Sequence, residues 1–583
     1  MARRTVIGIV AAVVVWSHAI GSGQSPFRTH NDRFDPPRLT TIEAWETRAD
    51  YVRQHVLASA GLLPMPEKAP LRPVVSGEVT RSGYRVAKVY FESLPGFFVT
   101  GNLYRPLGEG PFPAVVSPHG HWTYGRLENS PTTSGPGRAI GLARQGFVVF
   151  TYDMVGYNDS QQLPHTFGGR RETLWGLSLA GLQLWNSIRA LDFLESLPEV
   201  NRDALAATGE SGGGTQTFLL AAIDPRVKVA VPVNMISLHM QGGCLCENPP
   251  GLRLDTTNVE IAATIAPRPL LMVSATGDWT ANTMEVEYPA GRAVYALAGA
   301  ADRVHAVRIT AEHNYNKDSR EAMYAWMARW LQQAPPDVRI QEKSFTVEPL
   351  SELLVFHRRA LPDGAVNAAQ LTDNWIAAAN RQRSTPPSAE NAAALQHVLA
   401  IARDTVPAAA PPAFNRTVLL AHSDPAAAKA LSAAGYAVRA IPFTPFDAAA
   451  AAKVQHFETY NRTAAAQRAS DIAAAVRATP GAAIVADGDA ALAAMLAVAI
   501  VPAPIAVLDV GGFDTSDDAS FVERLYIPGL RRAGDVQTAA ALARGRLVVH
   551  NAGDRFAVRG VEVKKERLSL REIATVLKSP AGR

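Results

Sequence analysis

Short apolar runs alternate with helix-length amphipathic stretches between residues 85 and 333, and this alternation limits the fold more than any other feature of the sequence. The apolar runs, most of them rich in Val, Ile or Leu, cover residues 114–116, 147–152, 204–208, 229–233, 270–273 and 304–309. The amphipathic stretches cover residues 172–197, 215–222, 284–297 and 319–332. Short apolar runs of this kind are typical of strands buried on both faces of a parallel sheet. The pattern therefore predicts an α/β fold with a doubly wound, mostly parallel sheet.

Antiparallel strands are predicted at the start of this sheet, and a second sheet is predicted after it. Residues 85–93 and 97–104 alternate apolar and polar side chains around the turn signal Leu94-Pro95-Gly96. After a Pro-Ala linker at residues 406–414, new apolar runs separated by alanine-rich helical stretches cover residues 417–421, 437–441, 482–485, 505–508 and 547–549. Because 583 residues exceed one compact domain, we expect a second, smaller α/β domain.

The N-terminal segment predicts export. Arg3 and Arg4 precede an apolar stretch at residues 6–16, and small residues follow at positions 19, 21, 22 and 23. A cleaved signal peptide at residues 1–24 would place the mature chain in the periplasm or outside the cell. A retained anchor is the alternative, and the arginine pair leaves Sec and twin-arginine export both open. No later run reaches the ~20 apolar residues of a membrane span, so none is expected after cleavage.

Composition excludes two classes of protein. The net charge is +4 with no run of basic residues, which argues against a nucleic-acid-binding protein with a basic stripe. The hydrophobic fraction of 47% and the charged fraction of 19% exclude wholesale disorder. The chain therefore has ample material for cores, and its partners are expected among small or polymeric substrates rather than nucleic acids.

The segment Gly209-Glu210-Ser211-Gly212-Gly213 carries the chemistry. It fits G-x-S-x-G, and an apolar run leads into it while a helical stretch leaves it. This context is that of a sharp strand-to-helix turn that exposes a nucleophilic serine. A near-match around Ser178 lies inside a continuous helical pattern and is discarded for that reason. We predict that Ser211 is a catalytic nucleophile.

A serine nucleophile needs a general base and an orienting carboxylate, which in an open parallel sheet follow the carboxyl ends of later strands. His313 follows the run 304–309 and is the predicted base, whereas His305 lies at the beginning of that run. Asp278 follows the run 270–273 and is the predicted acid. The chain order Ser, Asp, His is that of α/β-hydrolases. Glu247 and Asp255, after the preceding strand, remain rivals for the acid.

The oxyanion formed by serine attack needs two hydrogen-bond donors. The backbone N–H of Gly212 supplies one by its position after the nucleophile. The other is expected in the loop Ser117-Pro-His-Gly-His-Trp122, from the backbone N–H of Gly120 or His121. Three side chains near these loops, His119, Trp122 and Trp279, are predicted to orient or bind substrate, with core packing as the alternative for the tryptophans.

Cysteine use predicts no disulfide framework and no metal centre. Cys244 and Cys246 are the only cysteines and stand one residue apart. A bridge between them would be strained, and no further soft ligands follow at the spacing of a zinc finger or ribbon. We expect two loop thiols, no metal and no cofactor.

A family resemblance covers residues 85–333. The segments Ser117-Pro-His-Gly-His121, Tyr152-Asp153, Gly209-Glu-Ser-Gly-Gly-Gly-Thr-Gln-Thr217, Gly242-Gly-Cys-Leu-Cys-Glu-Asn248 and Glu312-His-Asn-Tyr315 resemble secreted bacterial α/β-hydrolases of the acetyl xylan esterase type. The resemblance implies removal of O-acetyl groups from xylan or a related polysaccharide through an acyl-serine at Ser211. A prolyl-oligopeptidase-like peptidase or a general carboxylesterase of the dienelactone hydrolase type is the alternative, and a non-catalytic binding protein comes last.

The second region resembles a hydrolase sheet without its nucleophile. After the run 482–485 the turn reads Ala486-Asp487-Gly488-Asp489-Ala490, with no Ser or Cys at the elbow. Asp487 and Asp489 are expected to cap a helix, with binding of a cation as the alternative. The predicted organisation is a signal peptide at 1–24, an N-terminal extension at 25–84, a catalytic domain at 85–335, a connecting segment at 336–413 and a non-catalytic α/β domain at 414–583.

Overall fold

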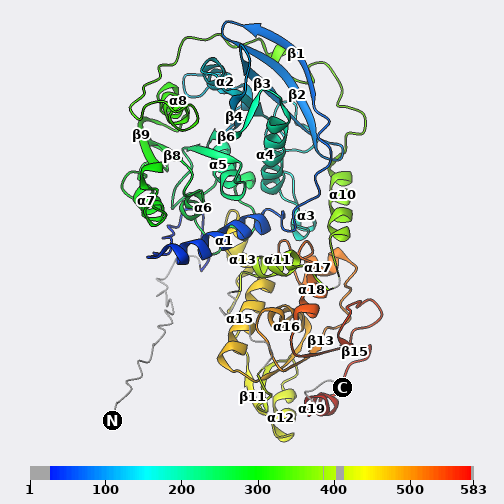
Figure 1. Cartoon of the computed structure of the whole chain (residues 1–583). Helices are drawn as coiled ribbons and strands as arrows, with labels where there is room; N and C mark the ends of the chain where they lie inside the picture. Colours follow the sequence, from blue (N-terminus) through cyan, green and yellow to red (C-terminus); the bar gives the residue numbers. More distant parts are fainter. Residues whose placement is uncertain (1–25, 385, 402–411, 579–583) are drawn as a thin grey trace, which may run out of the picture.

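The protein folds into two α/β lobes. A computed structural model describes residues 26–384, 386–401 and 412–578, and Figure 1 shows the two lobes one above the other. The predicted signal peptide and most of the predicted linker lie outside the described residues. No helix among the described residues is long and apolar enough to span a membrane.

The first lobe holds a nine-stranded sheet. Its strands are β1 (Val74–Arg81), β2 (Tyr84–Leu94), β3 (Phe97–Pro106), β4 (Phe112–Pro118), β5 (Val148–Tyr152), β6 (Val200–Glu210), β7 (Val227–Val233), β8 (Leu270–Gly277) and β9 (Val304–Glu312). Its helices are α1 (Ile42–Ser59), α2 (Gly135–Arg144), α3 (Arg170–Leu174), α4 (Leu179–Ser196), α5 (Gly212–Ile223), α6 (Asn258–Ala263), α7 (Glu287–Leu297) and α8 (Lys317–Leu331), with short 3₁₀ turns η1 (Gly125–Leu127), η2 (Leu245–Glu247) and η3 (Ala301–Arg303).

The sheet order confirms the predicted fold class. The strands run β1-β2-β3-β5-β4-β6-β7-β8-β9. Strands β1, β2, β3 and β5 pair antiparallel in sequence along one side, and β5, β4, β6, β7, β8 and β9 pair parallel. The carboxyl ends of the parallel strands therefore meet at one edge, where ligands bind in open α/β sheets.

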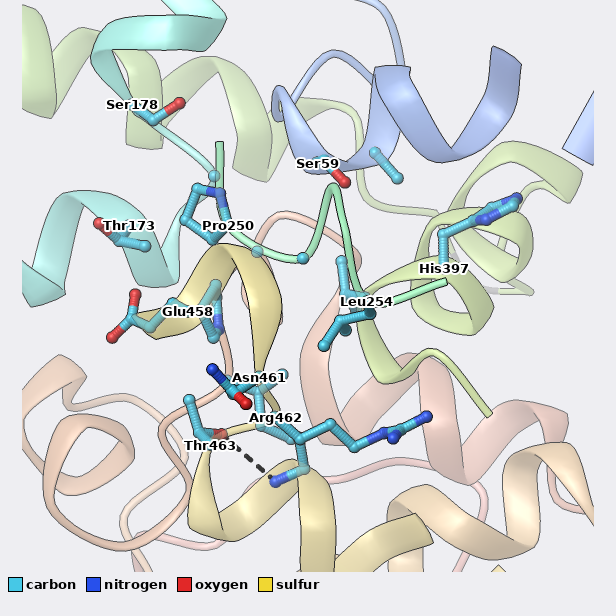
Figure 2. Close-up of a pocket in the computed structure, with 18 residues that line it drawn as sticks. Ser59, Thr173, Ser178, Pro250, Leu254, His397, Glu458, Asn461, Arg462 and Thr463 are labelled. Carbon is cyan, nitrogen blue, oxygen red and sulfur yellow. Dashed lines mark hydrogen bonds between the residues drawn. The ribbon is translucent and has the colours of Figure 1, made fainter. Parts of the chain in front are cut away.

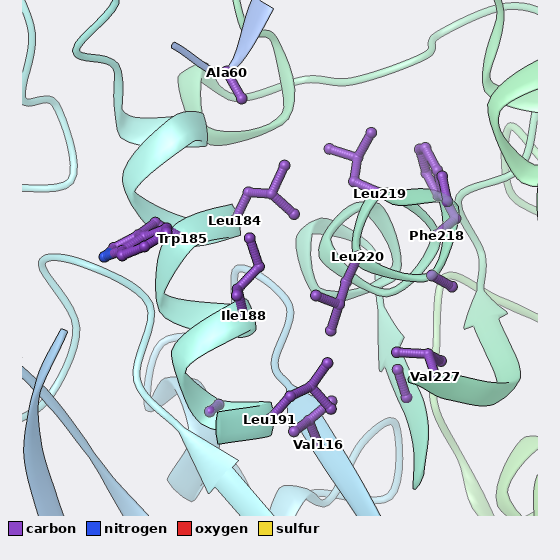
Figure 3. Packing of buried hydrophobic residues seen from close by; sticks show 14 of the residues in the cluster. Ala60, Val116, Leu184, Trp185, Ile188, Leu191, Phe218, Leu219, Leu220 and Val227 are labelled. Atoms are coloured by element: carbon purple, nitrogen blue, oxygen red, sulfur yellow. The ribbon is translucent and has the colours of Figure 1, made fainter. Parts of the chain in front are cut away.

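Helices on both faces of the sheet bury its apolar side chains. On one face α4 and α5 lie side by side over the sheet (Figure 3), and the interlocking side chains include Leu184, Ile188, Leu191, Leu219, Leu220 and, from β4, Val116. On the other face α2 and α8 form a separate core that includes Ile140, Met323 and Met327. Two buried layers hold the strands rigid, so the loops at their carboxyl ends are fixed at their bases.

Several elements differ from the sequence expectation. The helix predicted at 172–197 is broken into α3 and α4, and Ser178 caps α4 by accepting the Gly181 N–H, so it is not inside a continuous helix. Helix α1 and strand β1 lie in the predicted extension 25–84, and β1 pairs with β2 in the main sheet. Helix α2 begins Gly135-Pro136-Gly137, whose composition reads as a loop. The Ser134 side chain caps it instead by accepting the Gly137 N–H.

The connecting segment belongs to both lobes. It contains α9 (Leu350–Leu353), α10 (Ala368–Arg381) and α11 (Ala389–Leu399). Trp375 of α10 packs in the core of the first lobe, whereas Leu395 of α11 packs in that of the second. Asp159, in the loop after β5, accepts the backbone N–H groups of Val355 and Phe356 and thereby fastens the segment to the first lobe.

The second lobe is the predicted smaller α/β domain. Its parallel strands β10 (Thr417–Ala421), β11 (Ala437–Ala440), β12 (Ala483–Asp487), β13 (Ile505–Asp509), β14 (Arg546–His550) and β15 (Glu562–Val563) lie in the order β11-β10-β12-β13-β14-β15. Its helices are α12 (Ala426–Ala433), α13 (Ala448–Ala451), α14 (Phe457–Tyr460), α15 (Ala464–Ala478), α16 (Gly488–Ile500), α17 (Asp518–Arg524), α18 (Asp535–Leu542) and α19 (Leu570–Leu577).

The turn from β12 into α16 joins a parallel strand to a helix, as the turn at Ser211 joins β6 to α5. Gly488 has φ of 56°, close to the 57° of Ser211, but it carries no side chain. The expectation that Asp487 caps α16 is wrong, because its carboxylate instead accepts the N–H and Oγ of Ser423 across the strand ends.

The two lobes meet at a hydrogen-bonded junction. Backbone N–H groups of Gly251 and Arg253 donate to the carbonyls of Glu458 and Thr459, at 2.7 and 3.0 Å. Figure 2 shows the pocket beside this junction, lined by side chains of both lobes such as Ser59 and Thr463. At about 30 Å³ it has room for only a few water molecules. Helix α14 of the second lobe therefore supports the loop that follows β7.

Candidate active site

Ser211 lies at a strained turn between β6 and α5. Its backbone angles, φ of 57° and ψ of −122°, fall in a region that residues other than glycine rarely adopt. The Ser211 N–H donates to the Val233 carbonyl at the end of β7, at 3.0 Å, which fixes the turn against the sheet. This strand, turn and helix geometry is that of a nucleophile elbow.

Two glycines allow the close packing that the elbow needs. A Cβ atom on Gly209 would lie 2.4 Å from the Pro118 carbonyl oxygen, and one on Gly213 would lie 2.5 Å from the same atom. Strand β4 therefore passes directly under the elbow: a side chain at Gly209 would push β6 away from β4, and one at Gly213 would push α5 away from β4. The loop after β4 is brought to Ser211 by this contact.

His313 and Asp278 meet beside the elbow. The His313 Nδ1 lies 3.0 Å from the Asp278 Oδ2, and the Asp278 side chain is fully buried while that of His313 is 26% exposed. With Nδ1–H directed at the carboxylate, Nε2 is the nitrogen that can accept a proton. Thr280 also donates to Asp278 through its hydroxyl, at 3.2 Å.

The rival carboxylates are occupied elsewhere. Glu247 accepts the backbone N–H groups of Gly243 and Cys244, at 2.8 and 2.9 Å, and so closes its own turn. Asp255 lies 3.5 Å from Arg48 of α1. Of the three candidates, Asp278 is the one that the structure places against His313.

Trp122 and Trp279 flank the imidazole of His313. Their ring centroids lie 5.9 and 4.5 Å from that of His313. A Cβ atom on Gly120 would lie 2.9 Å from the Trp122 Nε1 and 3.2 Å from the Ser211 Cβ, so the loop after β4 contacts both the serine and the tryptophan. The structure therefore brings Ser211, Gly120, Trp122 and His313 into one site, where both predicted tryptophans pack near the imidazole of His313.

The oxyanion donors predicted from the sequence lie around Ser211. Gly212 is the first residue of α5, and the first N–H groups of a helix have no intrahelical acceptor. Gly120 also lies against Ser211, because a Cβ atom on Gly120 would lie 3.2 Å from the Ser211 Cβ. The His121 ring covers the Gly212 backbone, because a Cβ atom on Gly212 would lie 2.5 Å from the His121 Cε1.

His119 has a different placement from the predicted substrate contact. The side chain is buried, its Nε2 accepts the Met154 N–H at 3.0 Å, and its Nδ1 faces the Gly120 carbonyl at 2.7 Å. Both ring nitrogens are therefore engaged by backbone groups, which leaves no nitrogen for substrate. The physical role that this supports is to hold the loop after β4 against the loop after β5.

The burial of His119 predicts an acid-sensitive fold. Burial lowers the pKa of His119 to about 3, so between pH 6.5 and 3 the unfolded chain binds a proton that the folded chain does not. Stability therefore falls as the pH falls through this window, by about 1.4 kcal/mol per pH unit. We expect His119→Gln to shrink the loss of unfolding free energy between pH 7 and 5 by about 2 kcal/mol, measured by urea denaturation. The exposed His357→Gln is the control, and an unchanged pH dependence in His119→Gln would contradict the assignment.

A buried ion pair supports the elbow, and sequence reasoning missed it. Glu210, next to Ser211, accepts from Arg138 Nη1 at 2.8 Å and from Trp122 Nε1 at 2.9 Å. The Arg138 Nε also donates to Ser117, and its guanidinium lies 4.5 Å from the Tyr315 ring centroid. Within G-x-S-x-G, Glu210 stands at the unspecified position, so the motif gives no signal for it.

Removing one partner of this ion pair should destabilise the protein strongly. Arg138→Met leaves the Glu210 carboxylate buried without its cation, which costs about 3–5 kcal/mol. The matched control is Arg308→Met, which breaks an exposed pair with Glu285 and should cost about 0–1 kcal/mol. Chemical denaturation measures both, and equal losses in the two variants would contradict the role assigned to Arg138.

The structure also brings His121 and His165 to the two cysteines. One donor atom from each of His121, His165, Cys244 and Cys246 lies within 4.8 Å of the others. The sequence argument against a metal was that no further soft ligands stand near the cysteines. The fold overturns that argument, because the loops after β4 and β5 bring two imidazoles to the cysteines from 125 and 79 residues away in the sequence.

Comparisons with known proteins agree with an esterase fold. No protein-family model matches the chain. Putative hydrolase YtaP of Bacillus subtilis (strain 168) is 27% identical over 256 residues, which cover 41% of this chain and 84% of YtaP. The solved structure of Methylesterase BT1017 is 30% identical with a TM-score of 0.51, and covers 58% of this chain and 75% of its own. The acetyl xylan esterase from Paenibacillus sp. R4 is 18% identical with a TM-score of 0.33, over 51% of this chain and 97% of its own.

Proposed function

The chain belongs to the esterases of the α/β-hydrolase fold, and on that premise we propose that it is a serine carboxylic-ester hydrolase that acts on esterified carbohydrates. The observation that carries the proposal is the pairing of His313 with the buried Asp278 beside a serine held at φ of 57°. An idle glycine-rich turn would need neither the strain nor the pair.

The mechanism follows from the placement of these three side chains. The Ser211 Oγ attacks the ester carbonyl carbon while His313 Nε2 takes the hydroxyl proton, and Asp278 stabilises the imidazolium. The N–H groups of Gly212 and of Gly120 or His121 bind the oxyanion, each worth roughly 3 kcal/mol in the transition state. His313 returns the proton to the leaving alcohol. A water molecule, deprotonated by the same nitrogen, then attacks the acyl-serine, and His313 returns this proton to the Ser211 Oγ as the carboxylic acid leaves and ionises.

The substrate class that we propose first is an O-acetylated polysaccharide such as xylan. Its support is the resemblance of the motif segments to esterases of the acetyl xylan type. A second class, a methyl ester on a carbohydrate carboxyl group, is supported by the 30% identity to a protein named as a methylesterase. The two classes share the Ser211 chemistry and differ in which side of the ester carries the sugar, so the released product separates them.

The deciding experiment measures both products. The purified chain is incubated with acetylated xylan and, separately, with a methyl-esterified polyuronate, beside Ser211→Ala. Acetate release that needs Ser211 supports the first substrate class, and methanol release that needs Ser211 supports the second. Cleavage of a peptide substrate with neither product would overturn the esterase proposal in favour of a peptidase.

For the second lobe we propose a non-catalytic supporting role. Its strand-to-helix turn carries Gly488, with φ close to that of Ser211. Its helix α14 accepts backbone N–H groups from the loop that follows β7 and donates the Thr459 hydroxyl to the Asn248 carbonyl of that loop. For the whole chain we propose export to the periplasm or the cell exterior, which the predicted signal peptide supports. Mass spectrometry of the N-terminus of the protein recovered from the periplasm or the medium tests this. A chain that begins near residue 25 supports export with cleavage, and a chain that still carries Met1 would contradict cleavage.

A further inference from the structure

Four side chains that the proposed mechanism does not use converge beside the nucleophile. The His121 Nε2 lies 3.0 Å from the Cys246 Sγ, and the His165 Nε2 lies 3.4 Å from the Cys244 Sγ. All four donor atoms lie within 4.8 Å of one another, and three of the residues are half-buried while Cys246 is buried. Two thiols and two imidazoles are the donor set of tetrahedral zinc sites.

We propose that His121, His165, Cys244 and Cys246 form a tetrahedral Zn²⁺ site. With zinc–nitrogen bonds of about 2.0 Å and zinc–sulfur bonds of about 2.3 Å, neighbouring ligand atoms in a tetrahedron lie about 3.3–3.8 Å apart. The two contacts of 3.0 and 3.4 Å fall close to that spacing, and the remaining pairs, all within 4.8 Å, would close by at most about 1.5 Å on metal binding. Two thiolates also neutralise the charge of the cation.

The surroundings orient the ligands as metal sites require. The His165 Nδ1 lies 2.6 Å from the Val155 carbonyl oxygen, so this nitrogen carries the proton and Nε2 is left as the free donor toward Cys244. Glu247 holds the turn of the cysteines through the N–H groups of Gly243 and Cys244, and Asn248 donates to the Cys244 carbonyl at 2.8 Å. Such contacts fix the direction of the ligating atoms before a metal binds.

The site would tie together three loops at the active edge of the sheet. His121 belongs to the loop after β4, His165 to the loop after β5, and the cysteines to the loop after β7, where Cys246 lies in η2 and Cys244 directly precedes it. Four protein ligands leave no open position, so the ion is structural and takes no part in the ester chemistry. Its expected effect is to hold the His121 ring in place over Gly212 and so to fix the loop that carries the predicted oxyanion donors Gly120 and His121.

Metal titration of the unmodified protein tests the proposal without relying on activity. The chain is reduced, stripped with a chelator, shown by thiol titration to hold two free cysteines, and titrated with Co²⁺ under argon. We expect one Co²⁺ per chain, with the intense visible bands of tetrahedral cobalt and thiolate-to-cobalt charge transfer in the near ultraviolet, both abolished by Zn²⁺. Neither band appearing on folded, reduced protein would overturn the proposal.

Variants assign the ligands. Cys244→Ser and Cys246→Ser should each remove most of the charge-transfer intensity, and His165→Gln should remove the tetrahedral bands, whereas the exposed His357→Gln should leave both unchanged. The Ser211→Ala chain should bind one Co²⁺ as well as the unmodified protein does, so failure of the esterase proposal and failure of this one are separable. Full spectra in both cysteine variants would overturn the assignment.

Discussion

Ser211→Ala should lower kcat for ester hydrolysis by about 10⁵-fold while leaving the protein folded. The hydroxyl is the only group of the elbow that attacks the ester, and alanine leaves His313, Asp278 and the oxyanion donors without a nucleophile to serve. Alanine also fits the space of serine at a turn that the Val233 contact already fixes. Hydrolysis of a nitrophenyl acetate and far-ultraviolet circular dichroism measure the two quantities.

The matched control for this variant is Ser178→Ala. Ser178 also stands in a glycine-flanked segment, but it caps α4 and takes no part in the site. Losing this cap should cost about 1 kcal/mol of stability and leave turnover unchanged. Full activity in Ser211→Ala, or an equal loss in both variants, would contradict the assignment of the nucleophile.

Asp278→Asn should lower kcat by about 10⁴-fold. The amide is nearly the shape of the carboxylate, but its nitrogen can donate to His313 Nδ1, which favours the imidazole tautomer that carries its proton on the wrong nitrogen. The amide also cannot stabilise the imidazolium that forms during attack. Initial rates are measured over a range of substrate concentrations to obtain kcat. A thermal melt of the same variant shows whether the substitution has caused a folding defect.

Asp255→Asn is the control for Asp278→Asn, because the Asp255 carboxylate lies against Arg48 of α1 and not against His313. It should keep turnover within a few-fold of the unmodified protein. Unchanged turnover in Asp278→Asn together with a collapse in Asp255→Asn or Glu247→Gln would move the orienting role to that carboxylate.

The strands of both sheets were predictable because their burial leaves a strong apolar signal. The predicted runs 204–208, 270–273 and 505–508 lie within the observed strands β6, β8 and β13. Side chains on both faces of a central strand must be apolar, which is why these runs stand out in the sequence. Strand β1 was missed because it is the exposed edge of the sheet and carries a largely solvent-facing sequence. Helix α2 was missed because glycine and proline at its start read as a loop, although Ser134 caps it.

The site was predictable where chain order and strand ends decide it, and less so where packing decides it. Ser211, Asp278 and His313 follow from the rule that catalytic groups gather at the carboxyl ends of strands. The buried partner Arg138 does not, because an arginine on a helix reads as a solvated residue. The contact of His165 with the cysteines could not be predicted from the sequence either, since only the folded loop after β5 brings His165 to Cys244, 79 residues away.

Labelling with a fluorophosphonate tests the central claim most directly, since the probe reacts only with an activated serine. The folded, unmodified chain is treated with the probe, digested, and the modified residue is identified by mass spectrometry. The serine mechanism predicts one adduct, on the peptide that carries Ser211, and no adduct in Ser211→Ala. No labelling of the folded chain, or labelling that persists in Ser211→Ala, would contradict it.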